Sequence, residues 1–331
     1  MDGDNKIQRN FEKSNINISI DIVRFIMALI VVSIHCNFFS QSSLQKTIWS
    51  FPVPFFAMTS GYFFRNADKN KLIKHIERMF FLILLGDVIN YPTMIYAQYK
   101  AGYIYMNWRY FFLENITLGH LWYLFGIIIC SILFFFVFYK MDNKYIKICI
   151  FISCVLLNFI LNIHNIIHLR SLTHYGNYYT EFLIRILYII PFFGVGILVR
   201  EFNVSLKYSM KKKIVYGVVI VYFIIRWLIH KRNPNITSFY INILIMIIIF
   251  EFFIQNPTIF SIDYRHALRL RFSSMVIYLI HPMIIGVVQN IIKLSDALYI
   301  YLVTLIISVT ISFFIYDLKE IIKNSLFYKN N

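Results

Sequence analysis

The sequence predicts an all-α integral membrane protein, a bundle of about ten transmembrane helices. Hydrophobic residues make up 59% of the 331 residues and charged residues only 15%, an apolar content that a soluble domain of this size does not need. The apolar residues gather in runs of about 20, the length at which an α-helix crosses the hydrocarbon core of a bilayer. A transmembrane β-barrel is instead encoded by alternating segments of about ten residues.

Ten apolar runs between polar breaks are the predicted spans, in chain order. They cover Ile18–Phe39, Ile48–Phe64, Met79–Tyr96, His120–Tyr139, Tyr145–Ile163, Phe182–Val199, Ile214–Ile229, Ile236–Phe253, Ser273–Ile292 and Leu298–Tyr316. We therefore expect one transmembrane domain over residues 18–317, between an N-terminal tail of residues 1–17 and a C-terminal tail of residues 318–331. The N-terminal tail is polar, so no cleavable signal peptide is expected.

The positions of the cationic residues predict the orientation. Most of the 32 Lys and Arg residues fall in the two tails and in alternate loops. The other set of loops holds only Lys46, Lys100, Arg109, Arg170, Lys231, Arg232 and Lys293. Because cytoplasmic loops carry the excess of Lys and Arg, both termini are expected in the cytoplasm. The same rule explains the net charge of +16 without a nucleic-acid partner.

Composition adds two further expectations. The cysteines Cys36, Cys130, Cys149 and Cys154 lie in apolar runs without a CxxC pair, so neither a disulfide framework nor a cysteine metal site is expected. The abundance of Ile, Asn, Lys and Tyr is typical of an AT-rich bacterial genome. We therefore expect a multi-pass protein of a bacterial cytoplasmic membrane, with the lipid bilayer as its first partner.

Ionisable side chains inside the apolar runs carry the functional signal, because each costs several kcal/mol unless it is paired or faces water. Arg24 and His35 share the first span, where about 100° per residue brings both side chains to one face, about 16 Å apart along the axis. Asp21 lies one turn before Arg24, within reach of an ion pair. The alternative is that Arg24 snorkels to the interface and His35 is a hydrogen-bonded core histidine.

The second span contains residues that shape helices. Pro52 and Pro54 are expected to bend or start the helix. Ser60 and Gly61, further along, permit the close approach of a neighbouring helix.

Two more histidines lie at or within predicted spans. His120 opens the fourth span before Trp122 and Tyr123, two residues typical of the interfacial aromatic belt. His281 lies near the middle of the ninth span, before the helix-kinking Pro282. No local ligand spacing joins these histidines to the one in the first span, so no metal is expected.

Taken together, these segments resemble the acyltransferase-3 family. The resemblance rests on Arg24-x10-His35, Phe51-Pro-Val-Pro-Phe-Phe-Ala-Met-Thr-Ser60-Gly61-Tyr62-Phe63, His120-Leu-Trp-Tyr-Leu and Tyr278-x-x-His281. Their order and spacing match along nearly the whole chain, as in short members of the family without a periplasmic domain. The paired arginines that often enter the third span in this family are represented here by Lys74 and Arg78.

The resemblance implies transfer of an acyl group, foremost acetyl, from cytoplasmic acetyl-CoA to a hydroxyl of a cell-envelope polysaccharide or lipid-linked sugar. It implies that His35 is the catalytic base, or carries the acyl group in a covalent variant. The residues expected to bind the donor are Arg24, Ser60, Tyr62, Lys74 and Arg78. The residues expected to bind the acceptor are His120, Trp122, Tyr278 and His281.

Two other functions fit parts of the same pattern. Arg185 and Arg226 near the outer ends of their spans, with His281 before a proline, also fit a transporter or flippase of a small polar solute such as serine. A structural subunit of a polysaccharide machine, with inert histidines, is the third interpretation. A homodimer is compatible with all three.

Overall fold

The computed structural model describes residues 17–38, 43–64, 69–100, 119–140, 178–201 and 239–329, with the short segment 217–222 and single positions between 143 and 228. The principal elements in this part of the chain are α2 (Ile18–His35), α3 (Ser43–Trp49), α4 (Pro52–Phe63), α5 (Lys69–Lys100), α7 (Trp122–Lys140), α10 (Tyr178–Glu201), α12 (Phe239–Gln255), α13 (Tyr264–Asn290) and α14 (Ala297–Lys329). The prediction of an all-α fold is therefore confirmed for the described residues.

Among the described residues, four helices are long and apolar enough to cross a membrane, namely Ile18–His35, Lys69–Tyr96, Tyr264–Asn290 and Ala297–Ser325. Shorter apolar helical segments cover Trp122–Val137 and Ile245–Gln255. The predicted spans Tyr145–Ile163 and Ile214–Ile229 fall largely outside the described residues, and Arg226 lies wholly outside them. A helical membrane protein is thus supported, whereas the number of ten spans and the cytoplasmic termini stay predictions.

Several helix boundaries differ from the predicted spans for local reasons. The second span is divided, because α3 ends at Trp49 and α4 begins at Pro52, whose missing N–H is not needed in a first helical turn. The helix of the third span begins earlier, at Lys69. α13 also begins earlier, after Asp263, whose side chain accepts a hydrogen bond from the backbone N–H of Arg265.

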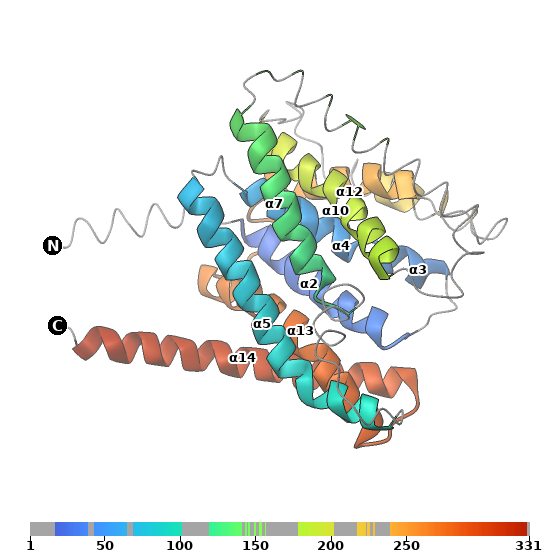
Figure 1. The fold of residues 1–331 in the computed structure, drawn as a ribbon, viewed down its shortest axis with the longest axis vertical. Helices are drawn as coiled ribbons and strands as arrows, with labels where there is room; N and C mark the ends of the chain where they lie inside the picture. Colours follow the sequence, from blue (N-terminus) through green and yellow to red (C-terminus); the bar gives the residue numbers. More distant parts are fainter. Residues whose placement is uncertain are drawn as a thin grey trace.

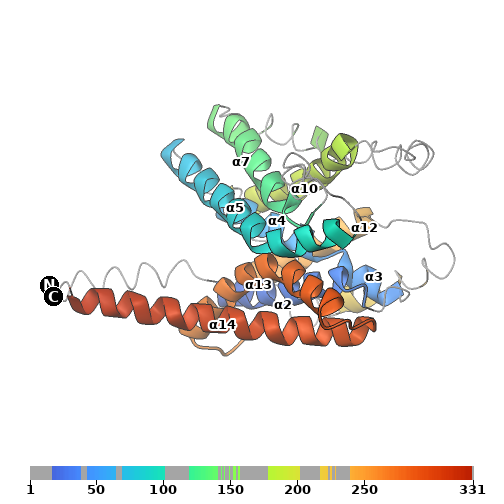
Figure 2. The ribbon, with the colours of Figure 1, turned by 60° about the horizontal axis from the view of Figure 1, so that its bottom comes forward.

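Residues 318–329 of the predicted C-terminal tail continue a helix. α14 runs without interruption to Lys329, although its last turns carry Asp317, Lys319, Glu320 and Lys323. In Figures 1 and 2 it lies along α13 and extends beyond the other helices.

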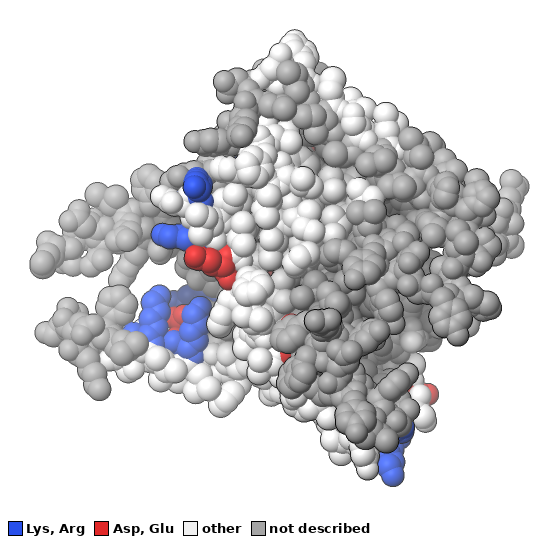
Figure 3. Space-filling view, viewed as in Figure 1, with Lys and Arg blue, Asp and Glu red and all other residues white. Residues whose placement is uncertain are grey.

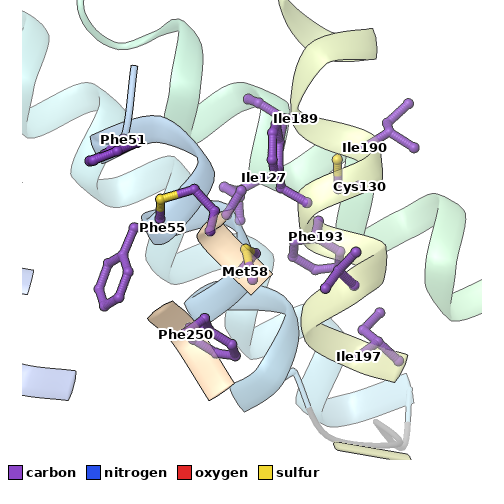
Figure 4. Packing of buried hydrophobic residues seen from close by; sticks show 14 of the residues in the cluster. Phe51, Phe55, Met58, Ile127, Cys130, Ile189, Ile190, Phe193, Ile197 and Phe250 are labelled. Atoms are coloured by element: carbon purple, nitrogen blue, oxygen red, sulfur yellow. The ribbon is translucent and has the colours of Figure 1, made fainter. Parts of the chain in front are cut away.

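α4 and α10 pack with their backbones in contact at two glycines. A Cβ atom on Gly61 would overlap the carbonyl oxygen of Phe193, and a Cβ atom on Gly196 would overlap that of Met58. Phe250 of α12 joins Met58 and Phe193 in the apolar core beside this crossing (Figure 4). The expected close approach of a helix at Gly61 is therefore confirmed.

α2 packs against α13 and α4, and also contacts α12 and α14. A second apolar core joins it to α5, α13 and the turn before α7 through Val32, Ile83, Leu121 and Ile277. As a result, side chains from several helices surround both ends of α2. These two ends hold the residues of the candidate site.

Candidate active site

Three histidines that are far apart in the sequence meet at the C-terminal end of α2. The ring centroids of His35 and His281 lie 4.9 Å apart, and those of His120 and His281 lie 5.6 Å apart. His35 ends α2, His281 lies within α13, and His120 comes just before α7. His35 is exposed, whereas His120 and His281 are buried. One exposed histidine thus lies beside two buried ones.

The buried histidines each hold a ring nitrogen with unused hydrogen-bonding capacity. His281 Nδ1 lies 3.0 Å from the carbonyl oxygen of Ile277, one turn earlier in α13. Since a carbonyl oxygen only accepts, Nδ1 carries the proton in this contact, and Nε2 of the neutral ring is an acceptor. Within the described part of the chain, neither His281 Nε2 nor His120 Nε2 has a hydrogen-bond partner. A ligand hydroxyl or a water suits such buried nitrogens.

Hydroxyl groups continue the polar region from the histidines towards α4. Tyr278 donates a hydrogen bond from its hydroxyl to the carbonyl oxygen of His120, which fixes the turn before α7. The ring centroid of Tyr123 lies 6.2 Å from that of Tyr278, and the Tyr123 hydroxyl lies 3.2 Å from Ser60 Oγ. Ser60 of α4, Tyr123 of α7 and Tyr278 of α13 therefore contact one another in a row between apolar helices. We call these three residues the polar path.

The N-terminal end of α2 carries a group of charged side chains. Arg271 donates two hydrogen bonds to Asp21, from Nε to Oδ1 at 2.7 Å and from Nη2 to Oδ2 at 2.6 Å. Arg24 Nη1 lies 3.5 Å from Asp21 Oδ1, and the Arg24 guanidinium lies 5.2 Å from the ring centroid of Phe63. The expected ion pair of Asp21 and Arg24 is confirmed, but Arg271 is the closer partner.

The comparison with known protein families identifies the kind of protein that carries the histidine cluster and the charged group at the two ends of α2. The family model described as an acyltransferase domain, that of the acyltransferase-3 family, matches residues 17–317. The chain belongs to the acyltransferase-3 family. No curated protein and no solved structure matches it significantly. As an acyltransferase-3 protein it is a membrane acyltransferase, and the matched region includes both ends of α2 and every residue of the polar path.

Two of the residues predicted to bind the acyl donor of this acyltransferase-3 protein lie on the surface. Lys74 and Arg78 are exposed near the beginning of α5. Figure 3 shows Lys and Arg side chains gathered mainly at one edge of the face drawn, with acidic side chains among them. The beginning of α5 lies at the same edge in Figure 1.

Tyr62 and Trp122 each lie beside an arginine of α10. The carbonyl oxygen of Tyr62 accepts a hydrogen bond from Arg200 Nη1 at 2.8 Å, and the Arg200 guanidinium lies 5.7 Å from the Tyr62 ring centroid. The Arg185 guanidinium lies 5.5 Å from the Trp122 ring centroid. These contacts place a cation next to each aromatic ring. Tyr62 lies two residues after Ser60, and Trp122 lies two residues after His120.

Two residues of this arrangement are absent from the site predicted by sequence. Arg271 belongs to a cluster of three arginines that resembles a cationic loop, and Tyr123 stands where interfacial aromatic residues are common. The structure turns Tyr123 towards Ser60 and Arg271 towards Asp21. The sequence signal for Arg271 is the buried acid in the first span, because Asp21 needs a cationic partner.

Across the described ranges, no group of three or more His, Cys, Asp or Glu side chains is arranged to hold a metal ion. The rings of His35, His120 and His281 are instead tilted or edge-on to one another. This arrangement suits hydrogen bonding and proton transfer.

Proposed function

We propose that this acyltransferase-3 protein transfers an acetyl group from cytoplasmic acetyl-CoA to a hydroxyl of a cell-envelope polysaccharide or lipid-linked saccharide. Another acyl-CoA can serve as donor by the same chemistry. The observation that carries the proposal is that the exposed residue His35, on the same helix as Arg24, has its ring beside that of the buried His281, itself next to the buried His120. In this proposal both termini are cytoplasmic, the host membrane is bacterial, and no nucleic acid takes part.

The charged end of α2 supports a donor site. CoA carries a 3′-phosphate and a diphosphate, and guanidinium groups bind phosphate oxygens through paired, charge-assisted hydrogen bonds. Arg24 provides one guanidinium, and Lys74 and Arg78 add exposed positive charge from α5. The helix rises about 16 Å from Arg24 to His35, a length that the extended pantetheine arm of CoA spans. Ser60 and Tyr62 would line its path.

His35 is the general base in this proposal. Its imidazole takes the proton of the acceptor hydroxyl while the hydroxyl oxygen attacks the thioester carbonyl carbon. As the tetrahedral intermediate collapses, the carbon–sulfur bond breaks, and the departing sulfur takes the proton from the imidazolium. CoA leaves as the thiol, and the imidazole is restored. In the covalent variant the acyl group passes first to a ring nitrogen of His35 and then to the acceptor.

The buried side of the histidine cluster supports an acceptor site. His281 Nε2 accepts hydrogen bonds in the geometry described above, so it is suited to a saccharide hydroxyl. His120 Nε2 offers a second polar contact, and Tyr278 holds the backbone of His120 in place. Trp122 offers an indole face to the apolar face of a sugar ring. These four residues would orient one hydroxyl towards His35.

The test is release of free CoA by purified protein in nanodiscs, supplied with acetyl-CoA and a crude envelope glycan fraction. We expect His35→Ala to lower turnover by about 100-fold or more, the usual contribution of a general base, while acetyl-CoA still binds. The matched control is His266→Ala on α13. The His266 side chain is 68% exposed, and it belongs to neither the histidine cluster nor the charged group of the candidate site. This variant should leave turnover unchanged.

Two outcomes contradict the proposal in different ways. If His35→Ala retains turnover, the base has been wrongly assigned. If acetyl-CoA neither binds nor is consumed by the wild type, even with envelope glycan present, transport of a small polar solute becomes the better interpretation.

A further inference from the structure

Asp21 is a buried carboxylate that two arginines share. It is 1% exposed, and it lies in the first turn of α2. Arg271 of α13 holds both carboxylate oxygens, and Arg24 approaches one of them at 3.5 Å. A buried anion of this kind must be paired, and here it is paired twice. The three side chains together carry a net charge of about +1.

The two arginines keep donors for another anion. Each guanidinium has five N–H donors in a fixed plane, and Arg271 spends two of them on Asp21. The Arg271 side chain is still 36% exposed and that of Arg24 is 20% exposed. Because Asp21 already fixes the Arg271 plane, a second anion orders little additional side-chain freedom when it binds.

Arg269, on the same helix as Arg271, is a comparison residue, because its guanidinium contacts α14 and not Asp21. Arg269 Nη2 lies 2.6 Å from Oδ2 of the exposed Asp317, and its guanidinium lies 4.3 Å from the ring centroid of Phe313. Both contacts are with α14. Arg269 therefore faces away from Asp21, although only one residue separates it from Arg271.

We propose that Arg24 and Arg271, held side by side by Asp21, form a two-arginine site for a phosphate of the CoA donor. Asp21 is the positioning residue of this site, because it contacts the arginines and not the ligand. The inference rests on the proposed function, and it adds Arg271 and Asp21 to the donor site. A phosphate bound there balances the positive charge that Asp21 leaves over, and its oxygens match the planar forks of both guanidinium groups.

The test is the dissociation constant of acetyl-CoA, measured by calorimetry on nanodisc-embedded wild type, Arg271→Gln, Arg271→Lys and Asp21→Asn. We expect Arg271→Gln to weaken binding by about 10-fold to 100-fold, the range for lost charge-assisted hydrogen bonds. Arg271→Lys keeps the charge but loses the fork, so an intermediate loss is expected. The matched control, Arg269→Gln, removes the same charge from the same helix and should change binding less than about twofold.

A second donor, 3′-dephospho-acetyl-CoA, distinguishes the two phosphate sources. If Arg271 holds the 3′-phosphate, wild type binds the dephospho donor more weakly, and Arg271→Gln causes no further loss with it. If Arg271 holds the diphosphate, Arg271→Gln weakens both donors by the same factor. Either pattern supports the two-arginine site.

Unchanged binding of both donors in Arg271→Gln and Arg271→Lys overturns the inference while leaving the proposed function intact. Absence of acetyl-CoA binding by the wild type overturns both. Thermal unfolding of each variant separates a local loss from misfolding. If Arg271→Gln and Asp21→Asn fail to fold, Arg271→Lys compared with Arg269→Gln decides, since equal affinities in those two variants also overturn the inference.

Discussion

The crossing of α4 and α10 gives the sharpest prediction of stability. A Cβ atom on Gly61 would lie 2.9 Å from the carbonyl carbon of Phe193 and still closer to its oxygen. Ordinary van der Waals contact begins at 3.4 Å, and backbone atoms of a packed helix cannot turn aside as a side chain does. Gly61→Ala therefore forces the helices apart by about 1 Å, at a cost of about 1–3 kcal/mol.

The same shift should reach the polar path. Ser60 precedes Gly61, and its Oγ lies 3.2 Å from the Tyr123 hydroxyl, near the upper limit for a hydrogen bond. We therefore expect Gly61→Ala to lower both the melting temperature, by about 5 °C, and the rate of CoA release. The assay is thermal unfolding in detergent, followed by tryptophan fluorescence, together with turnover at a temperature where all variants remain folded.

Three other glycines supply a graded control series. Gly196→Ala meets the backbone of Met58 and Tyr62 and should match Gly61→Ala. Gly126→Ala meets only the end of the Ile189 side chain, at 2.6 Å, so a smaller loss is expected. At Gly217 an added Cβ meets no atom of the described residues within 4 Å, so Gly217→Ala should be neutral or slightly stabilising. Equal melting temperatures for Gly61→Ala and Gly217→Ala would refute the packing described here.

Three further changes test other contacts. Tyr123→Phe removes the hydroxyl beside Ser60 and should cost about 0.5–1.5 kcal/mol in thermal unfolding, with Ser60→Ala adding little in that background. His281→Phe removes both ring nitrogens and should lower kcat/KM for the acceptor about 10-fold or more, while the dissociation constant of acetyl-CoA stays the same. Asp317→Asn breaks an exposed ion pair and should change stability by less than about 1 kcal/mol.

Each of these changes has a contrary result that would count against its reasoning. If the losses of stability in Tyr123→Phe and Ser60→Ala are additive, the two hydroxyls do not interact. A weakened acetyl-CoA complex in His281→Phe would move His281 to the donor side. A large loss of stability in Asp317→Asn would show that the end of α14 is held by its ion pair with Arg269.

The features that sequence predicted correctly are local ones. Arg24 and His35 lie on one uninterrupted helix, so its periodicity of 3.6 residues suffices to place them on one face. The pairing of Asp21 with Arg24 follows from the same spacing. Likewise, Pro52 starts a helix because its own chemistry favours the first turn.

The features that sequence could not predict depend on packing between helices. His120 meets His281 only because the turn before α7 packs against α13, and no local spacing encodes that contact. The sequence alone predicts Arg271 in a cationic loop. The structure places it in α13 because that helix begins directly after Asp263. Tyr123 is ambiguous for a related reason, since an aromatic residue at the end of a span suits both an interface and an interior.

The measurement that tests the central claim most directly is recovery of the transferred acyl group. Sealed membrane vesicles containing wild type or His35→Ala would receive labelled acetyl-CoA on the cytoplasmic side, and label in base-labile ester on envelope saccharide would be counted. We predict ester label with wild type and a loss of about 100-fold or more with His35→Ala. Equal ester label in both preparations, or label that stays on CoA throughout, would contradict the account.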